Sequence, residues 1–185
     1  MSLTTAWNDH MGKEASKYDV SEIPVPHFGP VAVADKRWIC KENVCHCYGA
    51  TWGCPPGVGT PAECASTLKL YPKCALISRR YAISIKERSA IDKMASDMQN
   101  TLRSFGHYLR GLGYKVLPLA DGGCNYCVEC SYPEPCKEPD DIVRSMGSYG
   151  IMIGEYLENC GIAVPFEEDA VTIRYLMLYD DSNVR

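Results

Sequence analysis

Four cysteines within thirteen residues are the densest group of reactive side chains in this sequence. Cys124, Cys127, Cys130 and Cys136 have the spacing C-x2-C-x2-C-x5-C. Thiolates at intervals of three residues can meet successive corners of one cubane cluster, as in the C-x2-C-x2-C-x3-C-P run of bacterial ferredoxins. Structural zinc more often takes two separated C-x2-C pairs. The spacing therefore favours a [4Fe–4S] cluster and leaves zinc, disulfides or unliganded thiols as alternatives.

The residues around this run suit a metal loop. Gly122 and Gly123 precede the first cysteine, and glycines let backbone amides approach sulfur atoms, where their hydrogen bonds tune a cluster's potential. Lys137 follows the last cysteine. It either offsets the negative charge of a cluster or is an ordinary solvated lysine. Four thiols this close together are too many to be explained as small core residues.

A second cysteine-rich stretch lies earlier in the chain. Cys40, Cys45, Cys54 and Cys64 give C-x4-C-x8-C-x9-C, and Cys47 is a fifth candidate. A second cubane needs four ligands, so one of the five would be spare. Two alternatives remain open: these thiols complete a site shared with the later run, or they only pack without metal.

The remaining cysteines and histidines give weaker indications. Cys74 and Cys160 lie among apolar neighbours on predicted regular elements, so we expect buried core thiols. His46 stands between two cysteines but has no second histidine at ligand spacing, so we expect a group beside the ligands or at the surface. The sequence contains neither a dinucleotide fingerprint nor a P-loop, nor a nameable nucleophile–base pair.

Composition limits the class of protein. The 185 residues carry a net charge of −4, with 46% apolar residues and eleven cysteines. This predicts one domain over residues 1–185, with no nucleic-acid partner. The odd cysteine count, with no secretory segment or long apolar run, argues against an exported disulfide-rich protein or a membrane span. We therefore expect a cytoplasmic protein whose thiolates are held by metal.

The longest predicted element is a helix from about Ser89 to Arg110, where apolar residues repeat at alternating intervals of three and four. This stripe consists of Ile91, Met94, Met98, Leu102, Phe105, Leu109 and Leu112. The polar positions between them, including Arg103, are expected on the face exposed to water.

A second helix is predicted to begin at Thr60. Thr60 is a suitable N-cap, Pro61 suits the first helical position and Glu63 completes a capping box. The helix should reach about Leu70 and carry Cys64 in its first turn. Its N-terminus would face the first cysteine loop, where it stabilises the negative charge of thiolates.

The other segments complete an alternating order of strands and helices. We predict strands over residues 31–39, 74–85, 114–119 and 171–179, and helices over residues 139–146 and 154–160. The polar and proline-containing residues 1–30 are expected to form a loosely packed arm. The order predicts an α/β (or α+β) sandwich, with helices packed on a small sheet and two cysteine-rich metal-binding loops over residues 40–64 and 122–139.

The two cysteine stretches together resemble a known family. The motifs are Cys40-x4-Cys45 with Tyr48-Gly49, Trp52-x-Cys54-Pro55-Pro56 and Glu63-Cys64, and then Gly123-Cys124 through Tyr132-Pro133 to Cys136. They are similar to the predicted metal-binding family called domain of unknown function 2284. The resemblance implies metal binding, presumed iron–sulfur, with no established reaction. It supports Cys40, Cys45, Cys54 and Cys64 in the first loop, and Cys47 departs from it.

These observations predict a small iron–sulfur protein with one [4Fe–4S] cluster in the second loop and a second cluster in the first. It would transfer electrons to or from a redox partner protein, or sense redox state. One alternative is a structural zinc-binding or interaction module, in which the metal folds the loops. The other is an iron–sulfur enzyme acting on an unknown small substrate.

Overall fold

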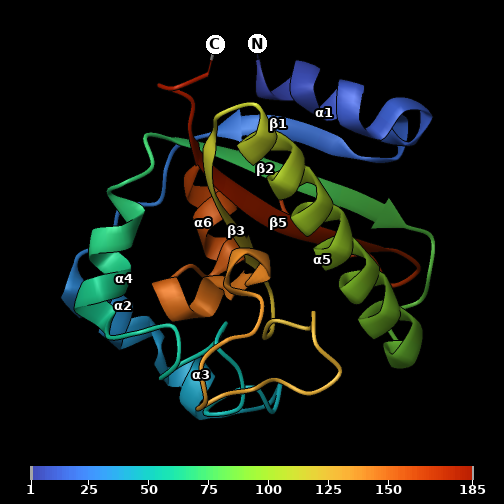
Figure 1. Ribbon diagram of the computed structural model, residues 1–185. Coiled ribbons are helices and arrows are strands. Elements are labelled where there is room, and N and C mark those ends of the chain that lie inside the picture. Colours follow the sequence, from blue (N-terminus) through green and yellow to red (C-terminus); the bar gives the residue numbers. More distant parts are fainter. Residues whose placement is uncertain (1, 185) are drawn as a thin grey trace.

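The computed structural model describes residues 2–184 as helices packed on a mixed five-stranded sheet (Figure 1). The strand order is β1-β2-β5-β3-β4. Strands β3 and β4 run parallel, and the other neighbours are antiparallel. The predicted fold class is therefore confirmed.

The centre of the sheet consists of β2 (Lys73–Tyr81), β5 (Val171–Asp180) and β3 (Lys115–Ala120). Consecutive residues of β5, Leu176 and Met177 among them, are fully buried. A strand that buries both of its faces must be covered by other elements on both sides. The three predicted strands are confirmed, although β2 ends at Tyr81 rather than reaching residue 85.

Helix α5 (Arg88–Gly111) covers one face of the sheet. The hydroxyl of Tyr175 in β5 donates to the carbonyl oxygen of Ala95 in α5, 3.1 Å away. Helix α1 (Leu3–Met11) lies beside α5, and the rings of Trp7 and Phe105 meet edge to face with centroids 4.9 Å apart. The apolar stripe predicted for α5 is thus confirmed.

Three further helices have seven or eight residues each, namely α2 (Pro30–Lys36), α4 (Pro61–Leu68) and α6 (Ile153–Asn159). Helix α4 begins with the predicted capping box between Thr60 and Glu63. The thiol of Cys74 is buried, as predicted, whereas Cys160 at the end of α6 is only half-buried. Among residues 2–184, no helix has both the length and the apolar composition to cross a membrane.

The prediction of a loosely packed arm over residues 1–30 is wrong. Leu3, Ala6 and Trp7 of α1 are buried, a 3₁₀ helix follows over Gly12–Lys17, and β1 (Asp19–Ile23) pairs with β2 as an edge strand. The polar composition of this segment concealed a short apolar stripe that packs on α5. Its one-sided pattern is normal for a helix and a strand at the edge of a domain.

Two other predictions of secondary structure are wrong. Residues 31–34 belong to helix α2, which starts at Pro30, and a short helix α3 (Trp38–Lys41) leads to the first cysteine loop. A short apolar run does not by itself distinguish a strand from a helix. Here Pro30 occupies the first helical position, where its fixed backbone angle favours a helix.

The segment 139–146 is not a helix. It contains a 3₁₀ turn (Pro139–Asp141), the two-residue strand β4 (Arg144–Ser145) and the start of a second 3₁₀ turn (Met146–Tyr149). The N–H of Ser145 donates to the carbonyl oxygen of Gly53 at 2.8 Å. This hydrogen bond and the pairing with β3 hold the backbone extended.

Candidate metal centre

The two cysteine loops lie side by side at the end of the sheet where β3 terminates (Figure 1). Strand β3 ends at Ala120, and the chain passes through Asp121, Gly122 and Gly123 into Cys124. The buried side chain of Gln99 on α5 donates to the carbonyl oxygen of Gly123 at 3.1 Å. The start of the second loop is therefore fixed by both the sheet and α5.

The four cysteines of the second loop line one small cavity of about 20 Å³. These cysteines are Cys124, Cys127, Cys130 and Cys136. Trp52 and Tyr126 also line the cavity. Burial raises the pKa of Cys136, and the nearby thiols of Cys130, Cys124 and Cys127 contribute in the same direction. The four predicted ligands therefore line one common cavity.

The size of this cavity bears on the group it would hold. Within residues 2–184, no three Cys, His, Asp or Glu side chains lie close enough together to hold a metal ion as they stand. A cavity of about 20 Å³ has room for about one water molecule. This volume is of the order needed by a single ion, whereas a four-iron cluster requires the loop to move outward. The loop is exposed, with Val128 at its tip fully accessible, so such movement meets little packing.

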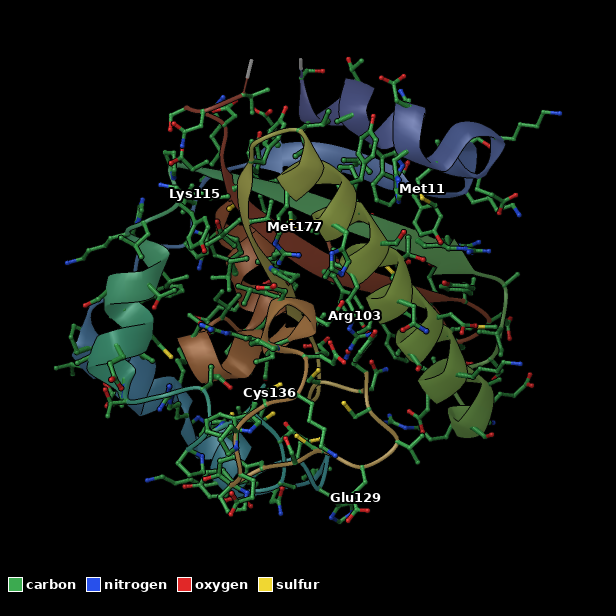
Figure 2. All side chains as sticks on the ribbon, in the orientation of Figure 1. Met11, Arg103, Lys115, Glu129, Cys136 and Met177 are labelled. Carbon is green, nitrogen blue, oxygen red and sulfur yellow. The ribbon has the colours of Figure 1, made fainter. Side chains whose placement is uncertain are left out.

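A buried arginine accompanies the second loop. Arg103 of α5 is only 4% exposed, and its Nη2 lies 3.6 Å from the Sγ of Cys124 (Figure 2). Its guanidinium donates to four oxygens, all neutral: Asp141 O, Asn100 Oδ1, Gln99 Oε1 and Asn125 Oδ1. The sequence prediction that Arg103 faces water is therefore wrong. Its charge is directed at the cysteine loop and at no carboxylate.

Cys47 belongs to the first group of thiols. Its sulfur lies 3.2 Å from the carbonyl oxygen of Cys45. A hydrogen bond with Cys54, with a smaller contribution from the Gly123 amide, lowers the pKa of Cys47 to about 6. The same hydrogen bond and burial raise the pKa of Cys54. Together with Cys40, whose thiol is close enough to Cys45 to interact with it electrostatically, these residues form one group.

Cys64 stands apart from this group. It is buried in the first turn of α4, and the Nη2 of Arg37 donates to its sulfur at 3.0 Å. Arg37 is itself buried and also donates to the carbonyl oxygens of Ser148 and Gly59, each at 2.8 Å. Burial raises the pKa of Cys64, and the charge of Arg37 opposes that increase. The structure thus gathers Cys47, rather than Cys64, with the other thiols of the first loop.

The two loops contact each other directly. A β-carbon added at Gly123 would lie 2.8 Å from the Sγ of Cys47, so only glycine allows this approach. Trp52 of the first loop donates from its indole N–H to the carbonyl oxygen of Glu134 at 2.8 Å, and its ring packs edge to face on Tyr132. The two groups of thiols therefore form one region of the molecule.

Several residues of this region were not identified from the sequence as parts of the site, namely Arg37, Gln99, Arg103 and Asp121. Gln99 and Arg103 lie one helical turn apart beside the apolar stripe of α5, which is the only local signal that they are buried. His46 adopts a left-handed backbone conformation with φ of 57°. Among the described residues, no hydrogen bond or ion pair connects Lys137 to the thiols, and its role stays a prediction.

Comparison with known proteins identifies one family. A family profile described as "Predicted metal-binding protein (DUF2284)" matches residues 30–179. This range contains every cysteine of both loops. No curated protein and no solved structure gives a match to the chain.

Proposed function

Because the chain belongs to the family of predicted metal-binding proteins DUF2284, we propose that it is an iron–sulfur protein that transfers electrons or senses redox state. Each cysteine group would hold one [4Fe–4S] cluster, which supplies one-electron chemistry when bound. The proposed ligands of the second cluster are Cys124, Cys127, Cys130 and Cys136. Those of the first are Cys40, Cys45, Cys47 and Cys54.

The buried charge of Arg103 is the observation that carries this proposal. A guanidinium removed from water is costly unless a negative charge compensates it, and its hydrogen-bond acceptors here are neutral oxygens. Four thiolates around a metal centre supply a net negative charge beside Cys124. Arg37 lies close to the first loop, where burial raises the pKa of Cys40 and the charge of Arg37 partly opposes that increase.

The choice of cofactor rests on the spacing of the ligands. Both iron–sulfur clusters and zinc–thiolate sites are negatively charged, so Arg103 does not distinguish them. Three thiols at intervals of three residues favour a cubane. The cavity of about 20 Å³ is the observation that favours the second candidate, a zinc ion that folds the loop. In that case the protein is a structural or interaction module.

A redox partner would dock where the loops reach the surface. Val128 and Tyr126 of the second loop are exposed, and so are Val44 and Tyr48 of the first loop. Exposed apolar side chains around a redox centre suit a transient electron-transfer interface, which is small.

Anaerobic purification of the intact protein, followed by assays of iron, acid-labile sulfide and zinc, tests the proposal. We expect eight iron and eight sulfide per chain if both groups are filled with [4Fe–4S], and an optical spectrum that bleaches reversibly on reduction. A colourless protein with stoichiometric zinc would support the second candidate instead. A chain that binds neither metal after anaerobic reconstitution would refute both.

A further inference from the structure

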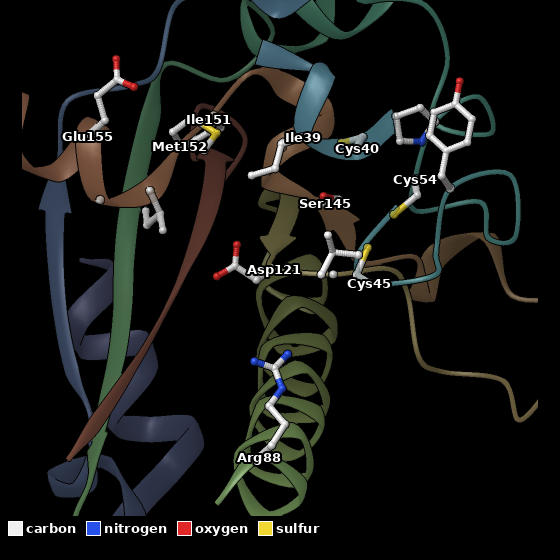
Figure 3. A pocket seen from close by; sticks show the side chains of 17 residues that line it. Ile39, Cys40, Cys45, Cys54, Arg88, Asp121, Ser145, Ile151, Met152 and Glu155 are labelled. Atoms are coloured by element: carbon white, nitrogen blue, oxygen red, sulfur yellow. The ribbon is translucent and has the colours of Figure 1, made fainter. Parts of the chain in front are cut away.

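A cavity of about 520 Å³ lies between the first cysteine loop and the segment around α6 (Figure 3). This volume is typical of a small-molecule site. Cys40, Cys45 and Cys54 line it on one side. Most of the remaining wall is apolar and comes from Ile39, Val44, Tyr48, Ile151, Met152 and Ile153.

One carboxylate faces this cavity without a partner. Asp121 follows the last residue of β3, and its side chain points into the cavity (Figure 3). Among the described residues, no donor lies within hydrogen-bond distance of its carboxylate and no cation forms an ion pair with it. Loss of water around its carboxylate raises the pKa of Asp121 to about 6, although the residue remains accessible from the cavity. It is therefore mainly ionised at neutral pH.

The other charged residues of the lining are already paired. Glu155 accepts from Lys36 at 2.5 Å, and Arg88 lies 3.1 Å from Asp92. Burial raises the pKa of Tyr175 in β5, and the nearby negative charge of Asp121 raises the pKa of this tyrosine further. Among residues 2–184, no cation lies within ion-pair distance of the Asp121 carboxylate, so this charge faces the cavity without a paired cation.

We propose that this cavity binds a small organic cation, an amine whose ammonium group pairs with Asp121 and whose apolar body packs against the walls. The site adds ligand binding to the proposed metal centre and does not require the metal. Its position places the bound molecule beside Cys40 and Cys45. A metal centre held by these residues would then lie next to the ligand.

Three probes that share a phenyl ring test the proposal. Benzylamine, benzyl alcohol and benzoate are titrated into the intact protein at neutral pH and followed by NMR. We expect benzylamine to bind most tightly and benzoate most weakly. Asp121→Asn should weaken benzylamine binding about tenfold and leave benzyl alcohol unchanged. Asp9→Asn removes an equal charge from the exposed surface of α1 and should change neither.

A steric variant tests the location. Gly154 lines the cavity and has open space where a β-carbon would lie, so Gly154→Leu should fill the cavity and abolish binding of both neutral and cationic probes. Gly111→Leu is the control, because Gly111 also has open space but ends α5 away from the cavity. Full benzylamine binding by Asp121→Asn or by Gly154→Leu would overturn the proposal.

Metal assays on the same samples separate this inference from the proposed function. A metal-loaded protein that does not bind benzylamine contradicts the ligand site alone. A protein that binds benzylamine through Asp121 but takes up no metal supports the ligand site and refutes the metal centre.

Discussion

Gly53 and Cys124 are in backbone contact across the two cysteine loops. A β-carbon at Gly53 would lie 2.8 Å from the amide nitrogen of Cys124 and 2.6 Å from the carbonyl oxygen of Val143. Gly53 precedes Cys54, and Cys124 is the first cysteine of the second group, so the two groups of proposed ligands meet here. Under the proposed function, clusters held by the two groups would be neighbours within one molecule.

Replacing Gly53 with alanine should separate the loops. The new methyl group meets two backbone atoms that cannot rotate away, so we expect a loss of about 2 kcal/mol in the free energy of unfolding. Chemical denaturation measures this loss. Gly111→Ala is the matched control, because space is open at that helical position and alanine favours the helix. Equal stability of the two variants would contradict the close contact.

Cys127→Ser should remove the metal of the second loop while leaving the helix–sheet core folded. Serine provides a poor ligand for a cluster or for zinc, and the loop contributes few residues to the core. Metal assays and circular dichroism measure the two effects. Cys160→Ser is the control, since Cys160 ends α6 and lies in neither cysteine loop. Full metal content in Cys127→Ser would refute the ligand assignment.

Cys47→Ser and Cys64→Ser should differ in metal content. Cys47 lies among the other thiols of the first loop, whereas the sulfur of Cys64 accepts a hydrogen bond from Arg37. We therefore expect Cys47→Ser to lose the metal of the first group and Cys64→Ser to retain it. The reverse result would restore Cys64, the residue favoured by the family motif, as the fourth ligand.

Arg103→Met should lower the reduction potential of the second centre. Reduction adds negative charge, which the buried guanidinium beside Cys124 stabilises. At an effective dielectric constant near 20, loss of this charge corresponds to a decrease on the order of 100 mV. Redox titration measures it. Lys93→Met removes an equal charge from the exposed face of α5 and should leave the potential nearly unchanged.

The stability of the protein should depend on pH through Asp121. Its pKa is about 6 in the folded state against a model value of 3.8, so the folded state binds a proton more tightly than the unfolded chain. The carboxyl group therefore contributes most to stability below about pH 4, and this contribution is lost as the pH rises through about 6. The difference in unfolding free energy between the wild type and Asp121→Asn should follow this course. No such change is expected for Asp9→Asn.

Elements with strong local signals could be predicted from the sequence. The capping box at Thr60 and Glu63 specifies the start of α4, and the apolar repeat specifies α5, because both signals lie within one or two turns of the chain. The errors occurred where distant segments decide the conformation. Strand β4 forms because Ser145 meets Gly53, and β1 forms because it pairs with β2.

The sequence by itself determined the chemistry that the second loop can offer, because a single turning loop can bring four thiols within thirteen residues to one site. Only the tertiary structure decided which thiols of the first loop lie together. Cys47 lies beside Cys54, whereas Cys64 is buried in the first turn of α4 against Arg37. Only the tertiary structure, likewise, buried Arg103 beside Cys124 and opened a cavity at Asp121. Burial and charge compensation depend on which distant segments pack together, and the spacing of residues along a chain does not encode them directly.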